Sequence, residues 1–342
     1  YYKSLDFCVK FLNDWKEDVE INKFDDLKIV EKIICKKIKI RNANEFGANS
    51  LYAFESAILK ALAYSKRKQL YEIVGNSRKM PTLVGNVIGG GLHSSSISKH
   101  PNFQEFLVIP KGKSISKNIQ AMNYLYNLAK KKLKIKKVND EGALLVPFND
   151  KDVLDLLNRF RIKTKKKFKF SIEIGLDCAS SSLFKNGNYN YYEKRINTEW
   201  QNKFIQELAE YYSLFYIEDP FHQRDFSSFA KLNKNVKLMV VGDDLTATQY
   251  NRTVRAIRTK SISGMIIKPN QNGSLLELKR IFDLCKKHGI KTILSHRSGE
   301  TMDNALADYA VGFGADYIKC GVSTSWREVK LKRLIEIEKR FK

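Results

Sequence analysis

Apolar residues in the first part of the chain recur three and four positions apart, which is the spacing of a helix with one buried face. The spacing runs through residues 5–12 and returns in a second set of residues: Leu51, Phe54, Ile58 and Leu62. Asn49 or Ser50 stands just before the second set, where its side chain could cap the first turn. We therefore expect residues 1–78 to form a small region that is mainly helical.

The pattern changes after Pro81. From there, short apolar runs alternate with longer amphipathic stretches, as in proteins whose helices surround a parallel sheet. Residues 79–342 are also close in number to a typical (β/α)8 barrel. The pattern therefore predicts an α/β fold with a barrel in this part of the chain.

Six of the apolar runs have a charged residue or histidine at or just after their ends. The runs cover residues 172–176, 215–217, 238–241, 265–267, 292–294 and 317–318. The polar residues are, in the same order, Asp177, Glu218, Asp243, Lys268, His296 with Arg297, and Lys319. Parallel strands of a barrel all end on one face, so we expect these side chains to meet at one mouth, where barrel enzymes carry their chemistry. Separate ion pairs at the strand ends are the alternative.

The sequence is strongly basic. Its 342 residues include 61 Lys and Arg against 37 Asp and Glu, which gives a net charge of +24. This charge would attract an anionic substrate, an acidic partner or nucleic acid, although a general enrichment in lysine also explains it. The Lys-rich stretches at residues 130–137 and 163–169 have the character of solvated helix faces without interleaved aromatic residues. Nucleic acid therefore remains only a charge-driven partner.

The cysteines and the apolar runs bear on the compartment. The five cysteines are widely spaced and form no CxxC pair, which argues against a disulfide framework and a structural zinc site: Cys8, Cys35, Cys178, Cys285 and Cys320. No apolar run approaches the roughly 18–20 residues that span a bilayer, and no signal peptide opens the sequence. We expect a soluble protein of the cytoplasm, a reducing compartment, with no membrane partner.

Three of the strand-end residues are carboxylates: Asp177, Glu218 and Asp243. In a dry pocket they would repel one another unless a cation lay between them. Oxygen ligands without cysteine or histidine favour Mg²⁺, with Mn²⁺ as a substitute. Lys268 and Lys319 close the other side of the mouth. A lysine whose pKa is lowered there could act as a base, or both lysines could simply balance the carboxylates.

Other residues suit an anionic substrate and an acid. Arg297 and Ser298 offer a guanidinium and a hydroxyl that fit a phosphate or a carboxylate. Glu105 lies in an apolar run, so we expect burial to raise its pKa and make it an acid. With Glu141 it could assist a departing hydroxide, although each of the two could instead make a structural hydrogen bond.

Five short strings at these positions resemble the enolase family and are specific to it. They are GLDCAS at 175–180, IEDPF at 217–221, GDDL at 242–245, IKPNQ at 267–271 and SHRSGET at 295–301. Weaker similarities at residues 47–49, 90–93, 104–106 and 140–142 occur in the family's order. The resemblance therefore covers nearly the whole chain.

The resemblance implies an enolase-type modified (β/α)8 TIM barrel at residues 79–342, preceded at 1–78 by the helical remainder of an N-terminal capping domain. It implies a lyase of glycolysis and gluconeogenesis, a phosphopyruvate hydratase, which converts 2-phosphoglycerate reversibly to phosphoenolpyruvate with Mg²⁺. Enolases are commonly dimers, so a homodimer is implied as well.

Matched residue by residue, the resemblance gives the candidates their roles. Asp177, Glu218 and Asp243 resemble the ligands of the first Mg²⁺, and Lys268 resembles the base that removes the proton next to the substrate carboxylate. The others are the acid Glu141 with its support Glu105, Lys319 at the carboxylate, Arg297 and Ser298 at the phosphate, and His93 and His296 in the pocket wall.

The sequence also departs from the family pattern. Nothing before Tyr2 corresponds to the N-terminal strand and the closing loop that helps hold a second Mg²⁺, so we expect closure and the second ion to be affected. Ser182 and Leu183 stand where the family has Glu and an aromatic residue, and Ala143 replaces a glycine. These departures and the net charge leave an alternative, a catalytically weak enolase-like protein that recruits nucleic acid or an acidic partner.

Overall fold

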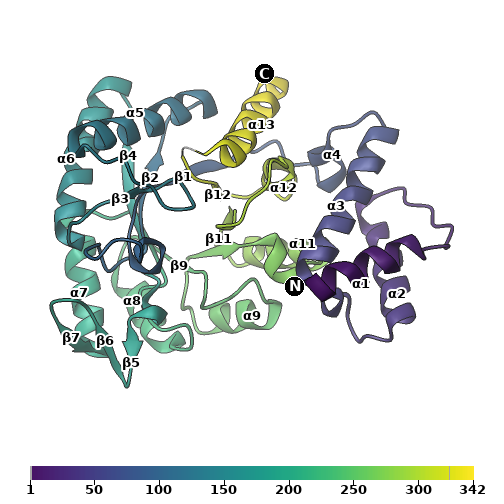
Figure 1. Ribbon diagram of the computed structural model, residues 1–342, viewed down its shortest axis with the longest axis horizontal. Helices are drawn as coiled ribbons and strands as arrows, with labels where there is room; N and C mark the ends of the chain where they lie inside the picture. The colour runs from purple at the N-terminus through teal and green to yellow at the C-terminus, as the bar shows by residue number, and fades with distance from the viewer. Residues whose placement is uncertain (1, 323) are drawn as a thin grey trace.

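We describe the protein from a computed structural model, whose described part covers residues 2–322 and 324–342 without the side chains of residues 2–5 and 7. Its first elements are helices α1 (Tyr2–Asn13), α2 (Leu27–Ile38), α3 (Ala48–Ser65) and α4 (Leu70–Val74), with the 3-10 turns η1 (Phe24–Asp26) and η2 (Ala43–Phe46). These helices gather on one side of the molecule (Figure 1). The expected helical character is present, while the division into domains at residue 78 stays a prediction.

Eight strands form a closed barrel. They are β1 (Thr82–Gly89), β2 (Glu105–Pro110), β4 (Ile172–Asp177), β8 (Tyr216–Glu218), β9 (Met239–Gly242), β10 (Gly264–Ile267), β11 (Lys291–Ser295) and β12 (Tyr317–Lys319). The order β12-β11-β10-β9-β8-β4-β2-β1 is closed by pairing of β12 with β1, and the short β3 (Leu144–Leu145) also pairs with β1. All six apolar runs contribute strands, so the predicted α/β barrel is confirmed.

One strand of the barrel runs against the others. β2 is antiparallel to both of its neighbours, β1 and β4, whereas the other neighbouring strands of the barrel are parallel. Glu105, the first residue of β2, therefore lies opposite Asp177, the last residue of β4. This reversal brings the start of one apolar run to the same mouth as the ends of the parallel strands.

Helices surround the barrel and begin at polar caps. The outer helices are α5 (Ile115–Leu133), α6 (Asp150–Phe168), α7 (Thr198–Tyr211), α8 (Phe226–Asn235), α9 (Tyr250–Arg258), α11 (Leu275–Lys287), α12 (Ala305–Gly312) and α13 (Ser325–Phe341). Ser114, Asn149 and Asn197 each accept a backbone N–H of the first turn, which fixes where α5, α6 and α7 begin. The Lys-rich stretches start in the last turns of α5 and α6, and their lysines are exposed as expected.

Shorter elements complete the fold. The 3-10 turns η3 (Gly91–Ser94) and η4 (Ser180–Ser182) and the four-residue helix α10 (Pro269–Asn272) follow strands of the barrel. A small antiparallel sheet consists of β5 (Phe184–Lys185), β6 (Asn188–Asn190) and β7 (Arg195–Asn197). Among the described helices, none has the length and apolar character needed to cross a bilayer. All five cysteines have free thiols.

Strand residues alternate between two apolar cores, as the two-residue period of a strand requires. Side chains inside the barrel form a small core: Val84, Leu107, Ile109, Tyr216, Met239, Val241, Ile266 and Ile293. Their neighbours along the strands, such as Leu83, Met265 and Ile267, pack outward against the helices in a larger core. The filled interior leaves the polar strand ends as one layer above it.

The N-terminal helices pack closely on the barrel. α3 contacts α10, and α4 contacts α12. α3 begins at Ala48 with Gly47 (φ +107°) as its N-cap, so the expected cap at Asn49 or Ser50 is wrong. Asn49 instead lies within the helix, where its Oδ1 accepts a hydrogen bond from Asn270 Nδ2 at 2.8 Å. Its side chain therefore joins α3 to the barrel.

Gly273 lies at this contact and allows a test of how tightly the helices are held. Its φ is +96°, and a Cβ there would stand 2.7 Å from the Ala48 Cα. We expect Gly273→Ala to lower the free energy of unfolding by about 1–3 kcal/mol, because backbone on one side or the other must move. Gly289→Ala is the control, since Gly289 also has a positive φ (+70°) but open space around its Cβ position. Equal losses in chemical denaturation would contradict the tight contact.

Candidate active site

The predicted strand-end residues meet at one end of the barrel. Asp177 and Glu218 are direct neighbours on β4 and β8, and Lys319 ends β12 beside Ser295 of β11. Asp243 and Lys268 immediately follow β9 and β10. The strand register itself therefore assembles carboxylates and lysines from distant parts of the sequence.

Lys319 is the centre of this assembly. Its Nζ lies 2.7 Å from Glu105 Oε2, 3.3 Å from Asp177 Oδ2 and 3.0 Å from both carboxylate oxygens of Glu218. Burial by itself lowers the pKa of Lys319, but these carboxylates outweigh it and hold the pKa well above its ordinary value. Lys319 is therefore a fixed cation, suited to bind an anion and unsuited to act as a base.

The positive charge of Lys319 does not fully compensate the burial of Asp177 and Glu218. Burial raises the pKa of Asp177 to about 6 although Lys319 opposes the shift, and neighbouring Glu105 and Asp243 raise it further. Burial, followed by the charge of Asp177, raises the pKa of Glu218 well above its ordinary value. Tyr216, two residues before Glu218 on the same face of β8, donates a hydrogen bond to Glu218 Oε2. A site of this kind favours an additional cation.

Lys268 forms an ion pair with Asp243 Oδ2. Burial is the largest influence and lowers the pKa of Lys268, but Asp243 and Glu218 outweigh it and raise the pKa. Of the two alternatives that the sequence left open, the raised pKa agrees with a lysine that balances a carboxylate in this structure, because Asp243 pairs with Lys268 directly. Asp243 Oδ1 is buried and has no hydrogen-bond partner among the described residues.

Asp219 positions the loop that carries Asp243. It is buried, its backbone has φ +42°, and its carboxylate accepts hydrogen bonds from the backbone N–H of Asp243 (3.1 Å) and Asp244 (2.6 Å). The sequence interpretation gave Asp219 no role, although it stands beside Glu218 in the IEDPF string. Its contacts show that it fixes the direction of the loop after β9.

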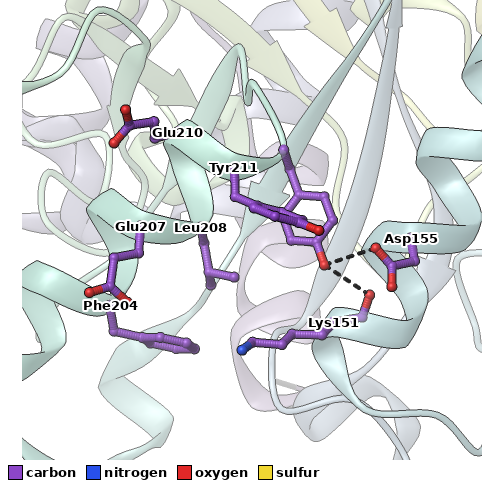
Figure 2. Close-up of a pocket in the computed structure, with 8 residues that line it drawn as sticks. Lys151, Asp155, Phe204, Glu207, Leu208, Glu210 and Tyr211 are labelled. Carbon is purple, nitrogen blue, oxygen red and sulfur yellow. Dashed lines mark hydrogen bonds between the residues drawn. The ribbon is translucent and has the colours of Figure 1, made fainter.

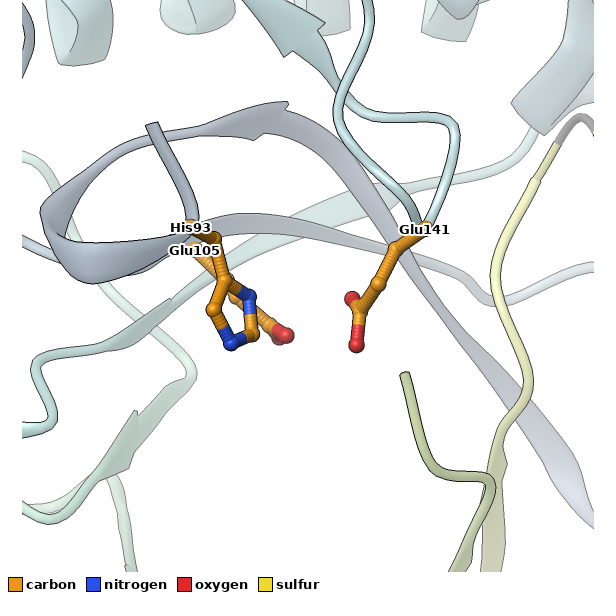
Figure 3. A group of neighbouring side chains, drawn as sticks. All are labelled: His93, Glu105 and Glu141. Atoms are coloured by element: carbon orange, nitrogen blue, oxygen red, sulfur yellow. The ribbon is translucent and has the colours of Figure 1, made fainter. Parts of the chain in front are cut away.

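His93, Glu105 and Glu141 form a second group at the mouth (Figure 3). One ligand atom from each lies within 4.8 Å of the others. Glu141 Oε2 accepts a hydrogen bond from Asn86 Nδ2 of β1 at 3.2 Å, and the Glu141 backbone N–H donates to Asn139 Oδ1 at 3.0 Å. The predicted proximity of Glu105 and Glu141 thus exists in the structure.

Glu105 has the pKa of a weak acid near neutral pH. Burial is the main cause and raises its pKa to about 7, against the lowering effect of Lys319 and with a contribution from Glu141. The direction expected from its apolar sequence context is therefore correct. The carboxyl group can hold a proton at neutral pH and release it without a large cost.

The loop after β11 carries the candidate anion-binding residues. His296 is buried, whereas Arg297 is half-buried and Ser298 is exposed. Arg297 and Ser298 line a cavity of about 680 Å³ whose other wall includes Asn49, Tyr52 and Lys60 of α3. The anion-binding loop and the N-terminal helices thus share one cavity.

Another pocket lies outside the barrel, between α6 and α7 (Figure 2). Its volume is about 730 Å³, and it is lined by Lys151, Asp155, Phe204, Glu207, Leu208, Glu210, Tyr211 and Tyr212. Tyr212 donates a hydrogen bond to Asp155 Oδ1 at 3.1 Å. None of the predicted site residues lines this pocket.

The donor chemistry at the mouth suits a hard divalent cation, although the described group whose ligand atoms lie within 4.8 Å of one another is His93, Glu105 and Glu141 and not the predicted set Asp177, Glu218 and Asp243. Asp177, Glu218 and Asp243 offer only oxygen donors, and Asp243 Oδ1 is left without a hydrogen-bond donor. In this structure two lysines contact these carboxylates directly. Lys319 contacts Asp177 and Glu218, and Lys268 contacts Asp243. The oxygen donors and the raised pKa values of Asp177 and Glu218 both agree with a site that binds a cation.

Comparison with known proteins gives matches over most of the chain. The family model "Enolase, C-terminal TIM barrel domain" matches residues 77–342. An enolase of Archaeoglobus fulgidus is 36% identical over 304 residues, which are 87% of this chain and 75% of that protein. An enolase of Sulfolobus acidocaldarius is 32% identical over 339 residues, or 96% of this chain and 80% of that protein. An enolase of Pyrobaculum aerophilum is 36% identical over 308 residues, or 86% of this chain and 72% of that protein.

Proposed function

Because the chain belongs to the enolase family, we propose that it catalyses the reversible, Mg²⁺-dependent dehydration of 2-phosphoglycerate to phosphoenolpyruvate. The observation that carries the proposal is the mouth itself. A buried cation, Lys319, contacts two of the three metal-type carboxylates, Asp177 and Glu218, and also Glu105, a carboxyl group with a pKa of about 7; the third carboxylate, Asp243, pairs with Lys268. An enolase needs a bound anion, a base and an acid, and the mouth offers a group for each.

Asp177, Glu218 and Asp243 are the proposed ligands of Mg²⁺. The ion would supply the charge that stabilises the substrate carboxylate as it gains negative charge. Lys319 would hold the same carboxylate, since the surrounding acids keep its pKa raised and its charge in place. Arg297 and Ser298 would bind the phosphate at the cavity beside α3, and His296 would line the substrate pocket.

Lys268 is the proposed base that removes the proton from the carbon next to the carboxylate. Its ion pair with Asp243 holds it protonated in the structure as described. If Asp243 were engaged as a metal ligand, Lys268 would lose this partner. Burial and the charge of Lys319 would then lower the pKa of Lys268 toward the range of a general base. The same contact thus couples the proposed base to the metal site.

Glu141 and Glu105 are the proposed acid pair. Burial raises the pKa of Glu105 to about 7 against the opposing charge of Lys319, and the neighbouring Glu141 adds to the shift, so the pair retains a proton near neutral pH. Transfer of that proton to the departing hydroxyl group releases water, while the electron pair of the broken C–H bond forms the new double bond. His93 closes this side of the pocket.

The proposal is tested by turnover of the purified chain. With 2-phosphoglycerate and Mg²⁺, we expect the absorbance of the phosphoenolpyruvate double bond to rise at about 1–10³ turnovers per second. Chelation of the metal should stop the reaction, and added Mg²⁺ should restore it. Absence of turnover at every Mg²⁺ concentration in a folded protein would refute the proposed activity.

Family membership also supports a cytoplasmic homodimer that acts in glycolysis and gluconeogenesis, which we propose on that ground. The alternative of a binding protein with little activity has no support from the three relatives named above, each of which bears the name enolase. The exposed lysines at 130–137 and 163–169 give it no specific site. The enzyme is therefore the function that the observations favour.

A further inference from the structure

Arg327, in the first turn of α13, is a fully buried cation to which the proposed reaction gives no role. A guanidinium has five N–H donors. In this protein all five are used: Nε donates to His296 Nδ1 (2.8 Å), Nη1 to Thr324 Oγ1 (3.0 Å) and the Asp140 carbonyl (3.3 Å), and Nη2 to the carbonyls of Arg297 (3.2 Å) and Ser298 (3.3 Å). Arg327 therefore ties the loop after β11 to the loop that carries Glu141.

The acceptors of Arg327 are all neutral. In the described part of the chain, no carboxylate oxygen lies within 4.0 Å of its guanidinium, although Glu141 and Glu300 act on it from further away. A buried charge without a close partner is expensive to maintain. Gly321, with φ +75°, makes room for it, since a Cβ there would lie 2.3 Å from Arg327 Cδ. The fold thus accommodates a costly cation directly behind the candidate anion site.

The contact with His296 fixes the state of the imidazole. A ring nitrogen that accepts a hydrogen bond carries no proton, so the proton of the neutral ring is on Nε2. Burial, followed by the charges of Arg327 and Lys319, lowers the pKa of His296 well below its ordinary value; Lys268 and Lys330 add to the shift. His296 is therefore a neutral N–H donor, and a cation on its far side strengthens that donor.

We propose that Arg327 is a positioning residue that holds His296 as an Nε2–H donor toward the anionic substrate and fixes the Arg297–Ser298 loop relative to Glu141. The inference rests on the proposed function for its kinetic consequence. Its structural part, the tautomer of His296, stands on the contacts alone. Lysine cannot replace Arg327 in this role, because an ammonium has three donors and lacks the planar fork that reaches three segments at once.

The variants are Arg327→Met, which removes the charge and the donors, and Arg327→Lys, which keeps the charge. The matched control is Arg333→Met on the same helix. Arg333 is also largely buried, but it pairs with Asp308 and Gln69 away from the loop after β11. A loss of stability alone should therefore affect the Arg327 and Arg333 variants alike.

The first readout is the ¹⁵N NMR spectrum of the histidine side chains without substrate. The chain has five histidines, and a His296→Gln variant identifies the signal of His296. We expect the wild type to show only the neutral Nε2–H form from about pH 5 to pH 8, the range in which an ordinary histidine titrates. In Arg327→Met the Nδ1–H form should appear and the ring should protonate at higher pH, whereas Arg333→Met should match the wild type. An Arg327→Met spectrum like the wild type would overturn the proposal.

The second readout is steady-state kinetics. We expect both Arg327 variants to raise KM for 2-phosphoglycerate and to lower kcat, each by about 10–100-fold, as is typical when the residues behind a site are removed. Kinetic constants equal to those of Arg333→Met would reduce Arg327 to a structural residue. If the wild type shows no turnover, the proposed function fails, and the His296 tautomer still decides this inference. If Arg327→Met does not fold, the same comparisons are made on Arg327→Lys.

Discussion

Replacement of Lys268 by alanine is expected to stop the exchange of the substrate α-proton with deuterium from solvent, while Mg²⁺ still binds. A positioned general base contributes about 10²–10⁴-fold to a rate, and no other described lysine forms an ion pair with Asp243. We therefore expect kcat to fall by about 10³-fold. Loss of the Lys268 ammonium leaves Asp243 without its cation, so Mg²⁺ affinity should not decrease.

The exchange is measured by proton NMR of 2-phosphoglycerate in D₂O, which reports C–H cleavage even when water is not eliminated. Lys279→Ala is the control, because Lys279 is a partly exposed lysine of α11 that pairs only with Asp283 in the described structure. Exchange at the wild-type rate in Lys268→Ala would show that another group is the base. Loss of Mg²⁺ binding in the same variant would show that Lys268 supports the metal site instead.

The strand ends were predictable because the barrel imposes a simple rule. Asp177, Glu218 and Lys319 each end an apolar run, and parallel strands carry such residues to one mouth whatever separates them in the sequence. The rule needs only the spacing of apolar residues. It therefore predicts that these side chains meet at one mouth, which they do in the structure.

Glu105 shows where the same rule fails. It stands at the start of its apolar run, which in a parallel strand would place it at the opposite end of the barrel. Only the antiparallel direction of β2 brings it beside Asp177, and strand direction depends on pairing that spacing does not reveal. The sequence predicted that Glu105 is buried, but only the structure shows which residues lie beside it.

Neither the burial of Arg327 nor the pKa of Lys268 could be predicted from the sequence, and the reason is related. Arg327 stands in a helix with several other basic residues, and nothing in that pattern distinguishes the two that are fully buried, Arg327 and Lys330. The sequence left open whether Lys268 has a lowered pKa or balances the carboxylates, because the direction of the shift depends on how its contact with Asp243 compares with burial and with the nearby Lys319. Both properties follow from side-chain contacts between elements, which no local pattern encodes.

Replacement of Asp243 by alanine is expected to remove Mg²⁺-dependent activity. Asp243 is one of three proposed ligands, and its Oδ1 is buried without a hydrogen-bond donor, so its loss weakens the ion site and leaves the buried Lys268 unpaired. A ligand that binds only the folded state stabilises it by about 2.7 kcal/mol at 100 times its Kd. The wild type should therefore melt at a higher temperature with Mg²⁺ than with a chelator, and Asp243→Ala should lose most of this difference.

Two measurements separate the metal role of Asp243 from its pairing with Lys268. The first is the Mg²⁺-dependent change in melting temperature, which needs no substrate, and the second is turnover across a Mg²⁺ titration. Asp283→Ala on α11 is the control, since it removes an exposed carboxylate that also pairs with a lysine. We expect this control to keep both the thermal shift and the activity. Near-native turnover of Asp243→Ala at ordinary Mg²⁺ would refute the ligand assignment. A lost thermal shift with retained turnover would instead show that the stabilising ion at Asp243 is not the one that the reaction requires.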